Sequence, residues 1–142
     1  MRTVRQLLEA KSPSTQTIAP DAPVLDALRL MAQHRIGAVL VMEGPRLVGI
    51  LSERDYARKV VLHGRSSADT PVSDIMSVDV VTATLLDTSD KCMQLMTERR
   101  IRHLPVLDGH EVVGIVSIGD LVKAVIEDQQ AELESLQRYI AS

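Results

Sequence analysis

The sequence has almost no aromatic side chains: its 142 residues include no tryptophan, no phenylalanine and two tyrosines. Proteins that bind single-stranded nucleic acid usually stack bases on aromatic rings, and this chain lacks that platform. Its 16 basic and 19 acidic residues give a formal net charge of −3, which argues against a nonspecific grip on a polyanion. We therefore expect no nucleic-acid partner and a core of aliphatic residues, methionine and alanine.

Cysteine is nearly absent as well. Cys92 stands alone, so it cannot form an intrachain disulfide, and no Cys/His cluster has the spacing of a zinc site. No apolar run approaches the roughly 18 residues of a membrane span, and the N-terminus does not read as a signal peptide. These absences predict a cytoplasmic protein with no metal site and no membrane contact.

An internal repeat organises the chain. Residues 49–55 (GILSERD) return as residues 114–120 (GIVSIGD), a shift of 65 positions (114 − 49). The register holds without a gap from residue 17 to residue 60, where 13 of 44 positions are identical to their partners. Upstream, residues 4–8 (VRQLL) resemble residues 72–76 (VSDIM) at a shift of 68. Chance does not maintain such a register, so we expect two similar halves that share one core.

The repeat predicts the domain boundaries. A stretch rich in glycine, serine, aspartate and proline separates the halves and reads as a linker. The predicted parts are repeat 1 at residues 1–63, the linker at 64–71, repeat 2 at 72–127 and a C-terminal extension of the last helix at 128–142.

Each half predicts the order strand, helix, strand, strand, helix. Residues 24–34 carry apolar side chains at helical spacing, and residues 89–99 are their counterpart. Two aliphatic runs within residues 37–51 flank turn-forming residues, which is typical of a hairpin. A second helix should begin near Ser52 and Ser117. The predicted fold class is α/β (α+β), with a small sheet and helices on one of its faces in each half.

These features resemble a tandem pair of CBS (cystathionine β-synthase) domains, known as a Bateman module. The resemblance covers about residues 1–127. It rests on the period near 65, on the Gly-hydrophobic-x-Ser-x-x-Asp box in both halves, and on residues 100–106 (RIRHLPV) before the second strand. It implies two β-α-β-β-α repeats related by pseudo-two-fold symmetry. It also implies a regulatory module that binds an adenosine ligand in clefts between the repeats.

The resemblance reaches the class of ligand. AMP is the first choice, and ADP, ATP, NAD and S-adenosylmethionine are alternatives. Because no catalytic or transport domain is attached, a stand-alone energy or redox sensor or adaptor is implied, acting on a regulated protein that the sequence does not name.

The Ser-x-x-Asp boxes carry the implied binding chemistry. In the family their aspartate takes the ribose hydroxyls, which corresponds to Asp55 and Asp120. An ionised carboxylate offers two acceptors to the two donors of a vicinal diol, and a helix N-terminus beginning at Ser52 or Ser117 offers N–H groups to a phosphate. The same spacing is also a helix-capping pattern. Both readings stay open, although an aspartate cannot fully serve both.

The resemblance assigns residues to two clefts. The Asp120 cleft comprises Asp120, Ser117, Ile115, Arg102, His103, Ile36, Gly37, Ala38, Ala22 and Ala27. The Asp55 cleft comprises Asp55, Ser52, Arg54, Ile50 and Ile101. Because Arg102 and His103 replace Gly37 and Ala38 of the first repeat, we expect the phosphate-bearing ligand in the Asp120 cleft. For the apolar residues, plain core packing is at least as good an interpretation.

The C-terminal segment predicts a helix with an apolar seam. No glycine or proline occurs between Asp120 and Ile140. The residues at heptad spacing are Val122, Ile126, Gln129, Leu133, Leu136 and Ile140. This seam favours a homodimer, with packing on the same module as the alternative.

No catalytic residue is expected. Residues 114–119 have serine one position too late for a nucleophile elbow, and the chain lacks the glycine-rich loops that cradle nucleotides in enzymes. Two hypotheses follow. The chain is a regulatory adenine-nucleotide-binding module, or it is a ligand-independent dimeric scaffold or protein-interaction module in which the boxes are only caps.

Overall fold

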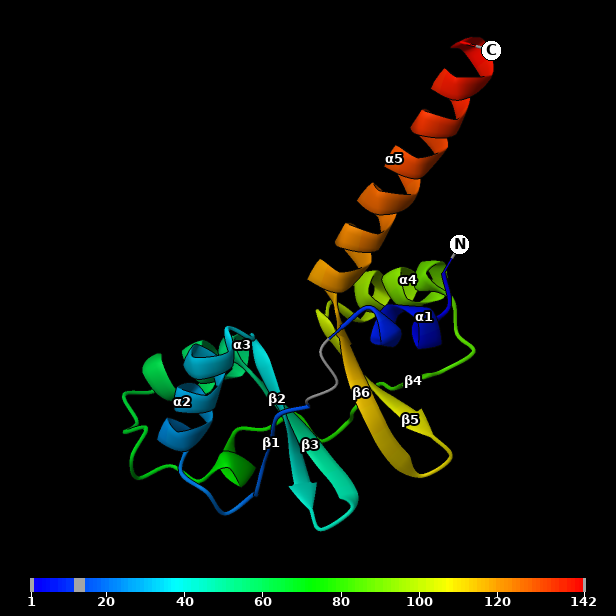
Figure 1. Ribbon diagram of the computed structural model, residues 1–142. Coiled ribbons are helices and arrows are strands. Elements are labelled where there is room, and N and C mark those ends of the chain that lie inside the picture. Colours follow the sequence, from blue (N-terminus) through cyan, green and yellow to red (C-terminus); the bar gives the residue numbers. More distant parts are fainter. Residues whose placement is uncertain (1, 12–14, 142) are drawn as a thin grey trace. The chain divides into compact units, whose positions relative to one another are not determined.

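The computed structural model of the chain describes residues 2–11 and 15–141 (Figure 1). Its contacts define two compact units. The Asp120 unit contains Met1–Pro13, Thr82–Leu107 and Gly114–Ser142. The Asp55 unit contains Ser14–Val81 and Asp108–Val113.

The Asp55 unit is built on the three-stranded sheet β1-β2-β3, in which β2 pairs parallel with β1 and antiparallel with β3. Its elements are β1 (Thr17–Ile18), α2 (Val24–His34), β2 (Ala38–Glu43), β3 (Arg46–Ser52), α3 (Glu53–Tyr56), a π-helical turn (Ala57–Val61) and a 3-10 turn (Val72–Asp74). Its core is aliphatic, as composition predicts. The buried members are Ile18, Val24, Ala27, Met31, Val39, Val41, Leu51, Val60, Val72 and Ile75.

The Asp120 unit repeats this plan with the sheet β4-β5-β6. Its elements are α1 (Val4–Glu9), β4 (Ala83–Thr84), α4 (Ser89–Arg99), β5 (His103–Asp108), β6 (Glu111–Ser117) and α5 (Ile118–Ala141). The predicted order of strand, helix, strand, strand, helix is thus confirmed in both halves, and so is the fold class. The predicted helices at 24–34 and 89–99 have the expected bounds.

The predicted linker is a packed turn that closes the start of α2. The N-cap of α2 is Pro23, whose side chain cannot cap the helix. Instead the first amides of α2 donate to this segment, Val24 N to Thr70 O at 2.8 Å and Leu25 N to Ser67 O at 3.0 Å. The buried Thr70 donates its own hydroxyl to Ser66 O at 2.6 Å. The turn-forming residues of this segment therefore cap the first amides of α2.

The N-terminal segments of the two repeats lie in exchanged units. The segment that opens repeat 1 carries Leu8, whose side chain lies against Gly114 on β6, so that a Cβ at Gly114 would stand 2.8 Å from a Leu8 methyl. The segment that opens repeat 2 carries Met76, which lies equally close to Gly49 on β3. Each glycine of the Gly-hydrophobic-x-Ser box is therefore small because another segment crosses the strand there.

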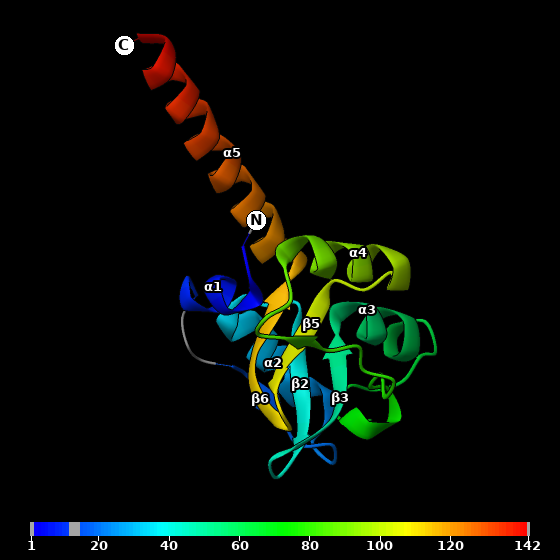
Figure 2. The same cartoon turned by 90° about the vertical axis from the view of Figure 1, so that its right-hand side faces the viewer.

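Helix α5 is the longest element, with 24 residues. Its first turns contact α1 and α4 and bury Leu121 and Ala124. Every residue from Ile126 to Ala141 is exposed, and the helix extends beyond α1 and α4 in both views (Figures 1 and 2). Within the described residues, no helix is both long and apolar enough to cross a membrane.

The two box glycines should respond differently to alanine. The three atoms nearest to a Cβ at Gly114 all belong to the flexible side chain of Leu8, whereas a Cβ at Gly49 would also stand 3.0 Å from the backbone oxygen of Ser77. We expect Gly49→Ala to cost about 1–3 kcal/mol of unfolding free energy through overpacking, and the matched Gly114→Ala to cost less. Urea denaturation of both variants measures the difference. Equal losses would contradict the described contacts.

Candidate functional site

Both Ser-x-x-Asp boxes cap the helices that they open. In the Asp120 unit the Ser117 amide donates to Asp120 Oδ2 at 2.8 Å, and the Asp120 amide donates to Ser117 Oγ at 3.2 Å. In the Asp55 unit Ser52 and Asp55 form the same reciprocal pair. The capping interpretation is therefore present at both positions, and any binding role has to coexist with it.

Lys11 joins the Asp120 box from far away in the sequence. Its Nζ donates to Asp120 Oδ2 at 2.8 Å and to the backbone oxygen of Ile115 at 2.9 Å. Both side chains are partly exposed, Lys11 at 32% and Asp120 at 23%. Lys11 lies shortly after the end of α1. Leu8, in α1, packs against Gly114 on β6 and so places this segment beside the box. Sequence analysis missed this lysine, because a residue outside the repeat register gives no local signal of such a contact.

Arg102 and His103 belong to the same neighbourhood. The backbone oxygen of Arg102 accepts the first amide of α5, from Ile118, at 2.9 Å. Burial lowers the pKa of His103 below its ordinary value of 6.5, the charges of Lys11 and Arg102 lower it further, and Asp120 opposes them. His103 is consequently neutral near pH 7, and only Arg102 of this pair is a permanent cation.

Asp55 is held by more donors than Asp120. Its Oδ2 accepts from the Ser52 amide at 2.9 Å and the Ser52 hydroxyl at 3.0 Å. Its Oδ1 accepts from the Ser77 hydroxyl and pairs with Lys59, both at 3.3 Å. At Asp120, by contrast, the Ser117 amide and Lys11 both use Oδ2, and Oδ1 takes neither bond. The Asp120 side chain is also the more exposed of the two, 23% against 14%.

A lysine neutralises each aspartate, but the two lysines come from different places. Lys59 lies in the π-helical turn that follows α3 and also donates to Ile75 O at 2.9 Å. Lys11 reaches Asp120 from the segment after α1. The two lysines are not equivalent positions of the repeat, since the counterpart of Lys59 at position 124 is an alanine. A cation beside the carboxylate is thus a shared feature of both boxes.

The apolar candidates of repeat 1 divide into two kinds. Ala27 and Ala38 are buried, which agrees with the core-packing alternative. Ile36 and Gly37 line an open hollow of about 610 Å³, and Gly37 O accepts the Glu53 amide at 3.0 Å. Ligand pockets commonly measure about 300–1,000 Å³, so the hollow has the size of one. Its other lining residues are Leu28, Met31, Ala32, Arg35, Glu53 and Tyr56.

The predicted site residues fall in both units. The Asp120 unit holds Asp120, Ser117, Ile115, Arg102, His103 and Ile101. The Asp55 unit holds Ile36, Gly37, Ala38, Ala22, Ala27, Asp55, Ser52, Arg54 and Ile50. Within the Asp120 unit, Lys11 links Asp120 to Ile115 directly. Within the Asp55 unit, Ile50 exchanges backbone hydrogen bonds with Ser77, whose hydroxyl reaches Asp55.

Comparison with known proteins identifies close relatives. The CBS domain family matches residues 4–62 and 72–127. CBS domain-containing protein CBSX3, mitochondrial, of Arabidopsis thaliana is 45% identical over 125 residues, covering 84% of this chain and 61% of that protein. CBS domain-containing protein YhcV of Bacillus subtilis is 36% identical over 115 residues and 81% of each chain. A solved structure of a protein with CBS domains from Burkholderia ambifaria is 51% identical with a TM-score of 0.88, covering 90% of this chain and 96% of that one.

Some more distant solved structures contain ligands or form assemblies. CBS domain protein PAE2072 of Pyrobaculum aerophilum, in complex with AMP, is 26% identical with a TM-score of 0.75, covering 84% of this chain and 89% of that one. The CBS domain pair of MJ0100, in complex with 5′-methylthioadenosine and S-adenosylmethionine, is 23% identical and shares the fold. A CBS-CP12 protein from bloom-forming cyanobacteria, 26% identical, is hexameric.

The burial of His103 predicts a pH effect on stability. Because its pKa is lower in the folded protein, the unfolded chain binds more protons, and stability falls as the pH drops below about 6.5. We expect His103→Gln to remove part of this loss between about pH 7 and pH 5. The His103 imidazole resonance should titrate below that of a model peptide in NMR spectra. His110→Gln, at an exposed histidine, is the control, and an ordinary His103 titration would disprove the effect.

Proposed function

The chain belongs to the CBS domain family, and from this premise we propose that it is a regulatory module, not an enzyme, that binds an adenine nucleotide through Asp120. AMP is the first choice, with ADP, ATP, NAD and S-adenosylmethionine as alternatives. The observation that carries the proposal is the Asp120 carboxylate, whose Oδ1 takes neither the Ser117 bond nor the Lys11 bond. That oxygen is suited to accept a ribose hydroxyl while Oδ2 keeps the helix cap.

The charges around Asp120 suit a phosphate. Lys11 neutralises the carboxylate at 2.8 Å. Arg102 adds a further positive charge; it lies just before β5, and its backbone oxygen accepts the first amide of α5. The positive end of the α5 dipole lies at the same place, because α5 begins at Ile118. A ligand that carries both a vicinal diol and a phosphate would use the carboxylate and these cations together. The AMP bound to the Pyrobaculum relative supports this class of ligand.

The assembly and location of the protein form a second part of the proposal. We propose a homodimer of cytoplasmic chains, each with repeats at residues 1–63 and 72–127, that acts on a separate regulated protein. The hexameric cyanobacterial relative supports self-association of such modules. The single cysteine, which is free and buried, supports a reducing compartment.

One observation favours the alternative of a ligand-independent scaffold. Asp55 and Asp120 both complete helix caps, and a cap alone accounts for the Ser-x-x-Asp spacing. In that case neither aspartate needs an available oxygen, and the difference between Asp55 and Asp120 has no functional meaning. Ligand binding decides between the two functions.

The two aspartates should contribute unequally to nucleotide binding. We expect AMP to raise the melting temperature of the wild-type protein, since a ligand at about 100 times its Kd adds about 2.7 kcal/mol. ADP, ATP, NAD and S-adenosylmethionine complete the panel. Asp120→Asn should weaken binding at least about tenfold in calorimetry, because a charge-assisted hydrogen bond contributes about 1.5–3 kcal/mol. The matched Asp55→Asn should weaken it less. No shift with any ligand would support the scaffold instead.

Lys11 should determine whether the site prefers a phosphate. We expect Lys11→Met to lower the ratio of AMP affinity to adenosine affinity about fivefold, the equivalent of about 1 kcal/mol. The reason is that the substitution removes the positive charge beside Asp120, which a phosphate needs and uncharged adenosine does not. Isothermal titration with both ligands measures the ratio. Arg5→Gln removes an equal charge from α1 as the control, and an unchanged ratio in Lys11→Met would exclude Lys11 from phosphate recognition.

A further inference from the structure

An apolar stripe runs along the exposed side of α5. Its members follow heptad spacing over the whole helix, with Gln129 as its one polar position. Their exposed fractions are 49% for Val122, 50% for Ile126, 55% for Leu133, 53% for Leu136 and 81% for Ile140. In heptad notation Ile126, Leu133 and Ile140 occupy positions a, and Val122, Gln129 and Leu136 occupy positions d.

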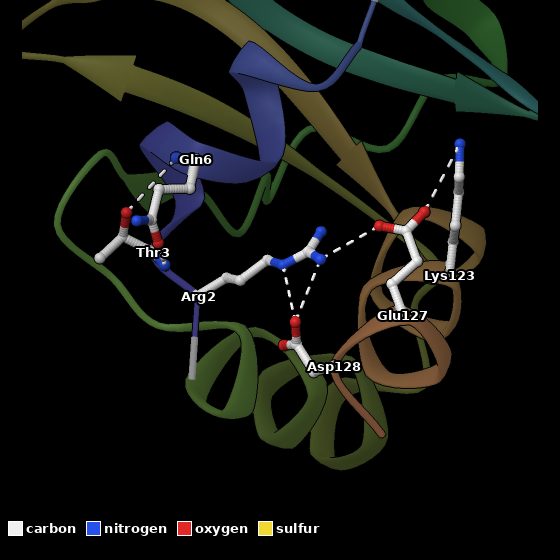
Figure 3. A network of polar contacts seen from close by, with 6 residues as sticks. All are labelled: Arg2, Thr3, Gln6, Lys123, Glu127 and Asp128. Carbon is white, nitrogen blue, oxygen red and sulfur yellow. Dashed lines mark hydrogen bonds and ion pairs between the residues drawn. The ribbon is translucent and has the colours of Figure 1, made fainter. Parts of the chain in front are cut away.

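The stripe is distinct from the face by which α5 docks on its own unit. The docking face buries Leu121 and Ala124 at heptad positions c and f. Arg2 extends this face by one turn, since its guanidinium reaches Glu127 and Asp128 at positions b and c (Figure 3). Positions b, c and f lie away from the a and d seam. The apolar stripe therefore points away from the unit even where the helix is docked.

The helix needs a partner along its second half. From Ile126 onward every described residue of α5 is exposed, so the second half of the helix buries little apolar surface. An isolated helix of about 12–15 residues is marginal in water even with favourable residues. The stripe offers a partner helix an apolar surface, because its side chains are aliphatic and repeat at coiled-coil spacing.

We infer that a second copy of this chain covers the stripe, and that the two α5 helices form a parallel, two-stranded coiled coil in register. This inference deepens the proposed homodimer by giving its interface and orientation, and it needs no bound nucleotide. Three seam residues fit this geometry, since isoleucine at Ile126 and Ile140 and leucine at Leu136 match the a and d preferences of parallel dimers. Leu133 at a and Val122 at d are apolar but reverse that preference.

Gln129 favours the parallel orientation. In a parallel pair the two Gln129 side chains face each other, and each amide can donate to and accept from its partner. In the antiparallel pair that overlaps all six layers, Gln129 faces Leu133, which offers no hydrogen bond. The polar layer thus selects both the orientation and the register.

A flanking charge favours the same orientation. Glu132 lies at position g beside the seam. In the antiparallel pair with full overlap, position g faces position g, so two Glu132 carboxylates would meet and repel each other. In the parallel pair Glu132 lies near Gln137 of the second copy, which is uncharged.

Disulfide cross-linking tests the orientation. We expect Leu136→Cys to give a covalent dimer under mild oxidation, because positions d face each other in a parallel pair. Glu134→Cys, on the outer side of the same helix, is the matched control and should cross-link little. Gln129→Cys is a second seam variant in case Leu136→Cys weakens the interface.

The native Cys92 is buried and serves as an internal control in the wild-type protein. If only a mixture of Ile126→Cys and Leu136→Cys chains cross-links, the orientation is antiparallel and the inference is wrong.

Light scattering tests the interface itself. We expect the wild-type protein to have the mass of a dimer and Leu133→Asp to have half that mass. Ser135→Asp adds the same charge outside the seam and should leave the mass unchanged. A monomeric wild-type protein would overturn the second copy as the partner, whereas a dimeric Leu133→Asp would place the dimer interface elsewhere. Neither result bears on nucleotide binding, which the thermal shift measures separately.

Discussion

In each unit a chain segment crosses closely over a glycine of the last strand, Gly49 on β3 or Gly114 on β6. This contact sets the arrangement of both Ser-x-x-Asp boxes. At Gly114 the crossing side chain is Leu8, and three residues further along the same segment Lys11 reaches Asp120. At Gly49 the crossing side chain is Met76, and its neighbour Ser77 reaches Asp55. A side chain at Gly49 would meet the Ser77 backbone and push the segment outward, and one at Gly114 would displace the Leu8 side chain that packs there. The glycine is therefore the steric condition for the chemistry six residues later.

This arrangement explains how two equivalent boxes come to differ. Both aspartates are capping residues at the same place in boxes that share glycine, isoleucine, serine and aspartate, and the donors around them come from different parts of the chain. The Asp55 segment supplies a hydroxyl, and Lys59 in the π-helical turn after α3 completes the donors around both oxygens. The Asp120 segment supplies Lys11, which shares Oδ2 with the cap. A cap and a diol can then divide one carboxylate between its two oxygens, which relaxes the conflict between these roles that the spacing alone implies.

Sequence reasoning predicted the local features well and the crossing contacts poorly. The two helices after Pro23 and Thr88, the hairpins and the long last helix follow from periodicity and turn residues, and the structure confirms them. Lys11 was missed because it lies 109 residues from Asp120, outside the register of the repeat. The assignments of Ile36, Gly37 and Ala27 to a nucleotide site stay predictions, and the burial of Ala27 agrees with the core-packing alternative.

The segment that opens repeat 1 holds α5 at two points. Lys11 pairs with Asp120 in the first turn, and Arg2 pairs with Glu127 and Asp128 about two turns later. A ligand whose ribose binds Asp120 Oδ1 places its phosphate near Lys11 and so acts on the first point only, whereas the Arg2 pairs at the second point keep α1 attached. A ligand shifts a conformational equilibrium only as far as its affinities for the two states differ. In this chain such a difference can arise at Lys11, because a ligand phosphate would compete with the Asp120 carboxylate for this lysine, and α5 extends from there to the exposed stripe.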